Sequence, residues 1–208
     1  MDEKTLKGFL DELASLSPTP GGGSVSALAG SIGASLLEMV CALTIGKEKF
    51  KQYDAELSGV KAEAAEMKSV LFALIEKDAR AFDMVMESFR MPKSTDDEKM
   101  SRSEAIQKAT CEATKVPLET AWRCLDILKK ISSVVEKVNP NAVSDIGVGA
   151  LLAQSGMEGA ALNVFINLPS IKDQAFREDS EKTIHAIRNE GRALKESVLK
   201  KVEEMIAR

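Results

Sequence analysis

Two aspartates stand in apolar surroundings, where a carboxylate could transfer protons. Asp145 lies near the start of the run from Ala142 to Leu168, in which Glu158 is the only other charged residue. Asp78 lies four residues before Phe82, so on a helix it shares a face with apolar side chains. A carboxylate in an apolar pocket can have a pKa near neutrality and act as a general acid or base. Two structural alternatives remain open: Asp145 could stabilise a helix N-terminus, and Asp78 could pair with a lysine.

A proline- and glycine-rich segment, Pro18 to Gly30, contains a second group of candidates. Gly21, Gly22 and Gly23 free the backbone, and Ser24 stands where we expect the N-cap of the following helix. Backbone N–H groups at such a helix start can bind a carboxylate, a phosphate or a carbonyl oxygen. The alternative is a simple loop that leads into a core helix. The candidate substrate-binding residues of this segment are Gly21, Gly22, Gly23, Ser24 and, within the helix, Ser26.

Further polar candidates flank Asp145 or lie near a predicted helix break. Asn141 and Ser144 are neighbours of Asp145, and Asn167 lies one turn after Asn163 at the other end of the same apolar run. For Asn163 we favour a hydrogen bond between helices. Arg90 and Lys93 flank the break at Pro92 and could bind an anionic group, although ordinary solvated surface is the usual environment of such charges.

Helical periodicity predicts the elements that must position these residues. Apolar residues recur at helical spacing through long segments, and Gly46, Pro92 and Asn139-Pro140 interrupt them. Thr95 and Glu98 form a capping-box pattern, and Pro117 should bend the helix that contains it. The predicted helices cover residues 3–16, 24–45, 54–89, 96–137, 142–168 and 173–206, the last with a break near its start.

The fold class that follows is all-α, in one domain over residues 1–208. Aromatic residues make up only 4% of the chain, and no stretch of useful length has the period of a strand. We expect about six helices in bundle-like or orthogonal packing, with two glycine-rich inner helices wrapped by long amphipathic ones. The inner helices should bring residues 21–26 and 141–145 together at their N-terminal ends. Their several small faces also predict a homodimer.

Composition excludes several classes of protein. The net charge of −4 and the pI near 5.3 argue against a general nucleic-acid binder. Three cysteines without paired spacing and a single histidine argue against a metal site. Residues 17–37 carry no charge, but prolines, glycines and serines interrupt them too often for a membrane span. The first residues do not resemble a signal peptide, so we expect a cytoplasmic protein with reduced cysteines.

Several segments together resemble the cyclodeaminase domain of the formiminotransferase-cyclodeaminase family. The similarity includes stand-alone bacterial relatives of the methenyltetrahydrofolate cyclohydrolase type, and its order and spacing cover nearly the whole chain. The matching segments are Pro18 to Gly30, Asp78-Ala79-Arg80-Ala81-Phe82, Met91-Pro92-Lys93 followed by Glu98-Lys99, Val116-Pro117-Leu118, and Asn141 to Asp145 followed by Gly159, Asn163-Val164 and Ile166-Asn167-Leu168.

This resemblance implies an all-helical dimer that acts on tetrahydrofolate derivatives in one-carbon metabolism. The first expectation is a lyase that closes 5-formiminotetrahydrofolate to 5,10-methenyltetrahydrofolate and releases ammonia. Two alternatives are a 5,10-methenyltetrahydrofolate cyclohydrolase and a folate-binding protein without catalysis, and a purely structural helical dimer is a third. The resemblance does not include the transferase half of the bifunctional enzyme, which leaves the source of any formimino substrate open. A separate formiminotransferase, as in histidine degradation, is one candidate partner.

The resemblance also gives the candidate residues their expected roles. Asp145 is the first candidate for the proton shuttle and Asp78 the second. The glycine turn and Ser24 would bind the pterin ring or a carboxylate through N–H donors. The candidates to bind the glutamate or polyglutamate tail are Arg90, Lys93, Arg102 and Lys47, with most weight on Lys93. No metal and no tightly bound cofactor is expected.

Overall fold

The computed structural model describes residues 5–207, and within them it contains helices and no strand. The prediction of an all-α fold with about six helices is confirmed. The α-helices are α1 (Leu6–Leu13), α2 (Gly22–Ala42), α3 (Asp54–Arg90), α4 (Asp96–Val134), α5 (Val143–Asn167) and α6 (Gln174–Ile206). Short 3-10 turns connect them: η1 (Glu48–Tyr53), η2 (Val135–Lys137), η3 (Pro140–Ala142) and η4 (Leu168–Ser170).

Local signals account for most helix ends. The Thr95 side chain accepts a hydrogen bond from the Glu98 N–H at 3.2 Å, and Glu98 bonds back to the Thr95 N–H, which confirms the capping box. Gly46 adopts a positive φ of 80° just beyond α2, as a residue that ends a helix does. Pro117 lies inside α4, and α6 runs without the predicted break.

The predicted bounds of two helices are wrong. The first helix covers only Leu6–Leu13 of the predicted 3–16, of which residues 3 and 4 lie outside the described residues. The second begins at Gly22, with Gly21 rather than Ser24 as its N-cap. Asp78 of α3 accepts hydrogen bonds from Ser24 at this helix start, which favours helical conformation from Gly22 onward.

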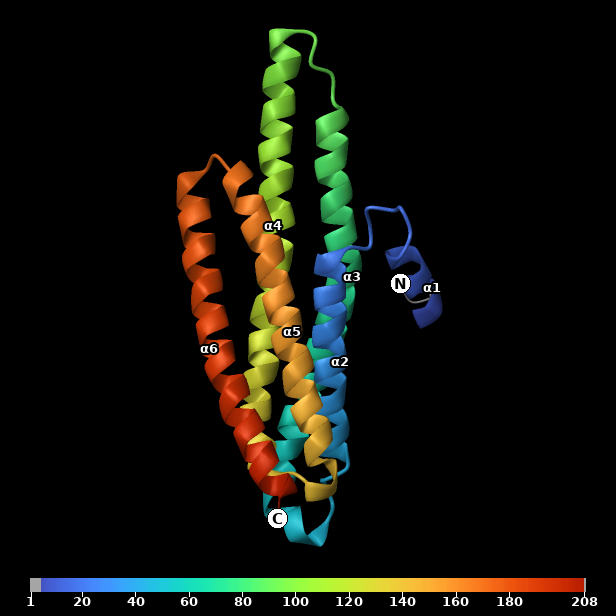
Figure 1. Cartoon of the computed structure of the whole chain (residues 1–208), viewed down its shortest axis with the longest axis vertical. Helices are drawn as coiled ribbons and strands as arrows, with labels where there is room; N and C mark the ends of the chain where they lie inside the picture. Colours follow the sequence, from blue (N-terminus) through green and yellow to red (C-terminus); the bar gives the residue numbers. More distant parts are fainter. Residues whose placement is uncertain (1–4, 208) are drawn as a thin grey trace.

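Helices α2 and α5 lie side by side as the inner pair, with α3, α4 and α6 packed around them (Figure 1). Glycines allow their backbones to approach closely. A Cβ on Gly33 would lie 2.9 Å from the Gly149 carbonyl oxygen, and one on Gly156 would lie 2.6 Å from the Ser26 carbonyl oxygen. The prediction of two glycine-rich inner helices is therefore confirmed.

The predicted orientation of the inner helices is wrong, because they run antiparallel. Gly22, at the start of α2, lies beside Asn163 near the end of α5, and the Thr44 hydroxyl beyond α2 accepts a hydrogen bond from Asn139 just before α5. The N-terminal ends of α2 and α5 therefore lie at opposite ends of the pair. Residues 21–26 and 141–145 form no common pocket within one chain.

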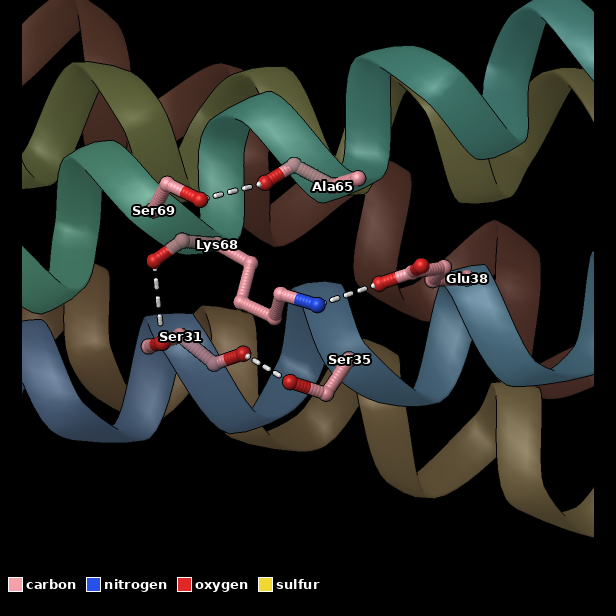
Figure 2. A network of polar contacts seen from close by, with 6 residues as sticks. All are labelled: Ser31, Ser35, Glu38, Ala65, Lys68 and Ser69. Carbon is pink, nitrogen blue, oxygen red and sulfur yellow. Dashed lines mark hydrogen bonds and ion pairs between the residues drawn. The ribbon is translucent and has the colours of Figure 1, made fainter.

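The polar residues of α2 find partners inside the bundle, as Figure 2 shows. Glu38, the only charged residue of α2, pairs with Lys68 of α3 at 2.6 Å. The Ser31 hydroxyl donates to the Lys68 carbonyl oxygen at 3.1 Å, and the Ser35 hydroxyl donates to the Ser31 carbonyl oxygen at 2.8 Å. These contacts pair the one charge of α2 with a lysine and give the Ser31 and Ser35 hydroxyls hydrogen-bond partners.

By length and composition alone, α2 could also cross a membrane, with a mean hydropathy of 1.6 over its best window. Half of that window is buried against neighbouring helices. We therefore interpret α2 as a core helix of the bundle. The thiols of Cys41 and Cys124 are buried in the core of the bundle.

Candidate active site

A cavity of about 340 Å³ lies where α2 begins, within the range of small-molecule sites. The loop before α2, the first turn of α2, and one face each of α3, α4 and α5 form its walls. Its lining residues are Pro18, Thr19, Gly21, Gly22, Gly23, Asp78, Phe82, Val85, Ala113, Asn163, Ile166 and Asn167. Asp78 is the only residue in this lining with an ionisable side chain.

The Asp78 carboxylate binds the start of α2 from the neighbouring helix α3. Its Oδ2 accepts a hydrogen bond from the Ser24 hydroxyl at 2.9 Å, and the carboxylate also bonds to the Ser24 backbone. Burial raises the pKa of Asp78, and the hydrogen bonds from Ser24 lower it by less. The net upward shift moves this carboxyl toward the range in which it can both accept and release a proton.

Gly23 makes the contact between Asp78 and α2 possible. A Cβ at position 23 would overlap the Asp78 carboxylate, whereas one on Gly22 would make only ordinary contact, 3.5 Å from Asn163 Nδ2. The three glycines at the start of α2 therefore have different structural roles. Gly23 admits the carboxylate to the helix start, and Gly21 and Gly22 form part of the cavity wall.

A larger hollow of about 490 Å³ lies on the outside of α4, around Trp122. Of its charged residues Lys115 is exposed and Glu119, Arg123 and Asp126 are half-buried, and Glu119 is paired with Lys77 at 2.8 Å. The smaller cavity combines a partly buried carboxyl, a helix N-terminus and two asparagines, a combination typical of a site that binds and transforms a ligand.

The structure brings together part of the predicted site. Gly21, Gly22, Gly23, Asp78 and Asn167 line one cavity. The Asn167 amide donates to the Ala113 carbonyl oxygen at 3.2 Å, which fixes its orientation. Instead of a lysine, Asp78 contacts Ser24, so the salt-bridge alternative does not describe its surroundings.

Two predicted binding residues lie behind the cavity wall rather than in it. Ser24 is fully buried, and its hydroxyl contacts Asp78 and the Ile75 carbonyl oxygen. Ser26 is 5% exposed, and its hydroxyl donates to the Gly22 carbonyl oxygen at 2.7 Å. Within one chain neither hydroxyl faces the space that a substrate would occupy, because each points into the helix packing.

Asp145, Asn141 and Ser144 lie at the opposite end of the bundle from this cavity. Asp145 is 18 residues from Asn163 on the same helix, which corresponds to about 27 Å. It stands in the first turn of α5, where a carboxylate favours the helix dipole. Asn141 lines a different hollow with Lys47, Lys49 and Asn139.

Arg90 and Lys93 lie at the tip of the hairpin formed by α3 and α4, which projects beyond the start of α2 (Figure 1). Both are exposed, and Arg90 is about 18 Å along α3 from Asp78. Within one chain they are not part of the cavity wall.

Sequence reasoning missed several residues of the cavity. The hydrogen bond between helices predicted for Asn163 is not present: its amide donates to the Gly159 carbonyl oxygen of the same helix at 2.9 Å, and Asn163 lines the cavity. Phe82 and Val85 form the wall on α3 beside Asp78. Their spacing of four and seven residues from Asp78 was the available signal, since it places all three on one helical face.

The described residues contain no group of three or more histidine, cysteine, aspartate or glutamate side chains that could hold a metal ion. The chemistry that the described cavity can perform rests on one carboxyl group, backbone N–H donors and two amides. This set can bind a flat polar ring and exchange protons with it.

Comparison with known proteins gives a consistent family relationship. The sequence model of a family described as formiminotransferase-cyclodeaminase matches residues 5–186. A methenyltetrahydrofolate cyclohydrolase from Methylorubrum extorquens is 40% identical over 203 residues, which cover 98% of each chain. A formimidoyltransferase-cyclodeaminase from mouse is 31% identical over 201 residues, and the chain spans only 37% of its length.

A solved structure shares the whole fold. The crystal structure of a formiminotetrahydrofolate cyclodeaminase from Thermotoga maritima superimposes with a TM-score of 0.89 over 99% of this chain and 98% of the other, at 28% identity.

Proposed function

Because the chain belongs to the formiminotransferase-cyclodeaminase family, we propose that it is a folate enzyme that hydrolyses 5,10-methenyltetrahydrofolate to 10-formyltetrahydrofolate. The observation that carries this choice of reaction is the 40% identity, over 98% of both chains, to a protein named methenyltetrahydrofolate cyclohydrolase. The partly buried Asp78 in the cavity supports it chemically, since the reaction needs a group that moves protons.

In the proposed first step, water attacks the bridging methenyl carbon. Asp78 accepts one proton from this water as the new C–O bond forms, which gives a tetrahedral intermediate. The methenyl substrate carries a positive charge shared between its two nitrogens. The ionised carboxylate of Asp78 would attract this charge in a cavity whose lining contains no other ionisable group.

In the proposed second step, the bond from the carbon to N5 breaks. Asp78 returns its proton to N5, and the hydroxyl of the intermediate loses its proton to solvent as the formyl C=O forms on N10. One water is consumed and one proton is released, so atoms and charge balance. Asn163, Asn167 and the start of α2 would hold the pterin ring through hydrogen bonds.

Formiminotetrahydrofolate cyclodeaminase activity is the second candidate. The structural match at a TM-score of 0.89 to a cyclodeaminase from Thermotoga maritima favours it. In this reaction N10 attacks the carbon of the protonated formimino group. The same carboxyl would take the N10 proton and pass it to the amine of the intermediate, which leaves as ammonia while the methenyl cation forms. The formimino substrate would then be supplied by a separate formiminotransferase.

A paired absorbance assay tests the proposal. Purified protein is mixed with 5,10-methenyltetrahydrofolate, and loss of the methenyl chromophore is compared with the spontaneous rate. In parallel, 5-formiminotetrahydrofolate is supplied, and both chromophore formation and ammonia are measured. Accelerated loss without ammonia formation supports the cyclohydrolase, whereas ammonia released together with new chromophore supports the cyclodeaminase. Folate binding with neither activity would contradict both reactions.

A further inference from the structure

Pro117 stands inside α4, and its missing N–H changes the hydrogen bonding one turn earlier in the helix. In an α-helix the N–H of each residue donates to the carbonyl oxygen four residues before it. Position 117 is four residues after Ala113, and proline has no N–H to donate. The Ala113 carbonyl oxygen therefore lacks its usual helical donor, although α4 continues from Asp96 to Val134.

A side chain from α5 supplies a donor in place of the missing N–H. Helices α4 and α5 pack against each other (Figure 1), and Nδ2 of Asn167, at the end of α5, donates to the Ala113 carbonyl oxygen at 3.2 Å. A half-buried carbonyl oxygen without a donor costs free energy, and this contact offsets the cost. Ala113 and Asn167 both line the cavity, so the contact between them is part of its wall.

The contact determines which end of the Asn167 amide faces Ala113. An asparagine amide has a donor end, Nδ2, and an acceptor end, Oδ1. Because a carbonyl oxygen can only accept, the reversed amide would place two acceptor oxygens against each other. Nδ2 must therefore face Ala113, and Oδ1 accepts no hydrogen bond from the described residues. An acceptor oxygen thus remains available to a ligand in the cavity.

Asn163, one turn earlier on α5, has the same polarity. Its Nδ2 donates to the Gly159 carbonyl oxygen at 2.9 Å, and its Oδ1 likewise accepts from none of the residues that the structure describes. Asn163 also lines the cavity, beside Gly22. Helix α5 therefore offers two acceptor oxygens, one turn apart, to a bound molecule. Such a wall favours a ligand with N–H donors at its edge, because a ligand without them would leave the oxygens unpaired.

We infer that Pro117 is a positioning residue for ligand recognition: it leaves the Ala113 carbonyl oxygen free to hold Nδ2 of Asn167, so that Oδ1 of Asn167 accepts from an N–H group of the ligand. Pro117 itself is buried and does not line the cavity, so it acts through Asn167. The inference rests on the proposed function for the identity of the ligand, a reduced pterin whose ring carries several N–H donors, but not for the contact between α4 and α5.

Selective ¹⁵N labelling of asparagine tests the contact by NMR without any ligand. The chain has five asparagines, so the side-chain amide signals are few, and Asn167→Leu identifies those of Asn167. In Pro117→Ala the new N–H competes for the Ala113 carbonyl oxygen, and we expect the Asn167 amide signals to shift. Pro92→Ala is the matched control, since Pro92 lies in the exposed connection between α3 and α4, and it should leave them unchanged. Unchanged Asn167 signals in Pro117→Ala would overturn the inference.

A double-mutant cycle tests whether Pro117 acts on the ligand through Asn167. The dissociation constant of 5-formyltetrahydrofolate, a stable reduced folate, is measured by equilibrium dialysis. Asn167→Leu keeps the approximate size of the side chain but removes the acceptor, and should weaken binding about tenfold. Pro117→Ala should weaken binding about three- to tenfold in the native background, a usual coupling within one hydrogen-bond network, and no further in the Asn167→Leu background. Urea denaturation checks that each variant is folded in the assay.

Two outcomes of the cycle would overturn the inference. Equal weakening by Pro117→Ala in both backgrounds would show that the proline acts through the shape of α4 and not through Asn167. Native affinity in Asn167→Leu would show that its oxygen accepts nothing from the ligand. If the native protein bound no reduced folate, the proposed function would fail, whereas the NMR comparison of ligand-free proteins would still decide whether Pro117 positions Asn167.

Discussion

The Ser24 hydroxyl lies 2.9 Å from Asp78 Oδ2 and 3.1 Å from the Ile75 carbonyl oxygen. It has one proton to donate, so its bonding depends on the state of Asp78. When Asp78 is ionised, the Ser24 hydroxyl donates its proton to the carboxylate. When Asp78 is protonated, the Ser24 hydroxyl accepts a hydrogen bond from the carboxyl group and donates its own proton to the Ile75 carbonyl oxygen. Both protonation states of Asp78 are therefore satisfied without movement of the backbone, as a group that gains and loses a proton in each turnover requires.

Replacing Asp78 with asparagine should reduce turnover by about 10²–10⁴-fold, the usual contribution of general acid–base catalysis. The amide keeps the size of the side chain and an oxygen that can accept from Ser24, so folate binding should remain measurable by equilibrium dialysis. Asp83→Asn, on the exposed side of the same helix, is the control and should retain activity. Near-native turnover in Asp78→Asn would exclude this carboxyl as the proton shuttle.

The same variant should become more stable relative to the native protein as pH rises. Burial raises the pKa of Asp78 in the folded state. Its contribution to stability is therefore fully present below the unfolded value of ~3.9 and is lost as pH rises through the folded pKa. Asparagine does not titrate and avoids this loss. Urea denaturation between pH 4 and pH 8 checks the sign, and a relative stability that falls with pH would contradict it.

Ser24→Ala should move the acidic limb of the pH–rate profile toward higher pH, because Asp78 loses a hydrogen bond that favours its ionised form. The hydroxyl lowers the pKa of Asp78, so removing it leaves burial less opposed. Ser26→Ala is the matched control, because Ser26 is also buried and its hydroxyl donates to the Gly22 carbonyl oxygen rather than to Asp78. If both variants gave the native profile, Ser24 would have only a packing role.

Gly23→Ala should abolish most activity, because the added methyl group would overlap the Asp78 carboxylate and displace it from the start of α2. Gly22→Ala should be tolerated, since its Cβ would make an ordinary contact 3.5 Å from Asn163. The turnover of the two variants is compared, and circular dichroism checks that both are folded. Equal activity in both would show that the contact between Asp78 and α2 is not needed.

Gly156→Ala should destabilise the protein by about 1–3 kcal/mol, the cost of overpacking a close contact. Its Cβ would lie 2.6 Å from the Ser26 carbonyl oxygen. Because this oxygen belongs to the backbone of α2, it cannot move aside by a change of rotamer, as a side chain could. Gly59→Ala on α3 meets nothing within 4 Å and should stabilise the protein by up to about 1 kcal/mol. Chemical denaturation of both compares the two effects, and a stabilised Gly156→Ala would contradict the close approach of α2 and α5.

Local patterns predicted the helices well because their signals lie within a few residues. The capping box at Thr95 and the apolar periodicity of 54–89 needed no information from distant segments. The start of α2 was misplaced because its acceptor, Asp78, is 54 residues from Ser24 along the chain. A cap supplied by another helix leaves no mark in the sequence around the helix that it caps.

By itself the sequence determined an all-α chain with two glycine-rich inner helices and two aspartates in apolar surroundings. Only the tertiary structure decided which aspartate joins the glycine turn. Small residues along two helices allow close packing in either direction, since steric fit does not depend on chain polarity. The antiparallel arrangement of α2 and α5 put Asp78 at the start of α2 and left Asp145 at the other end of the molecule.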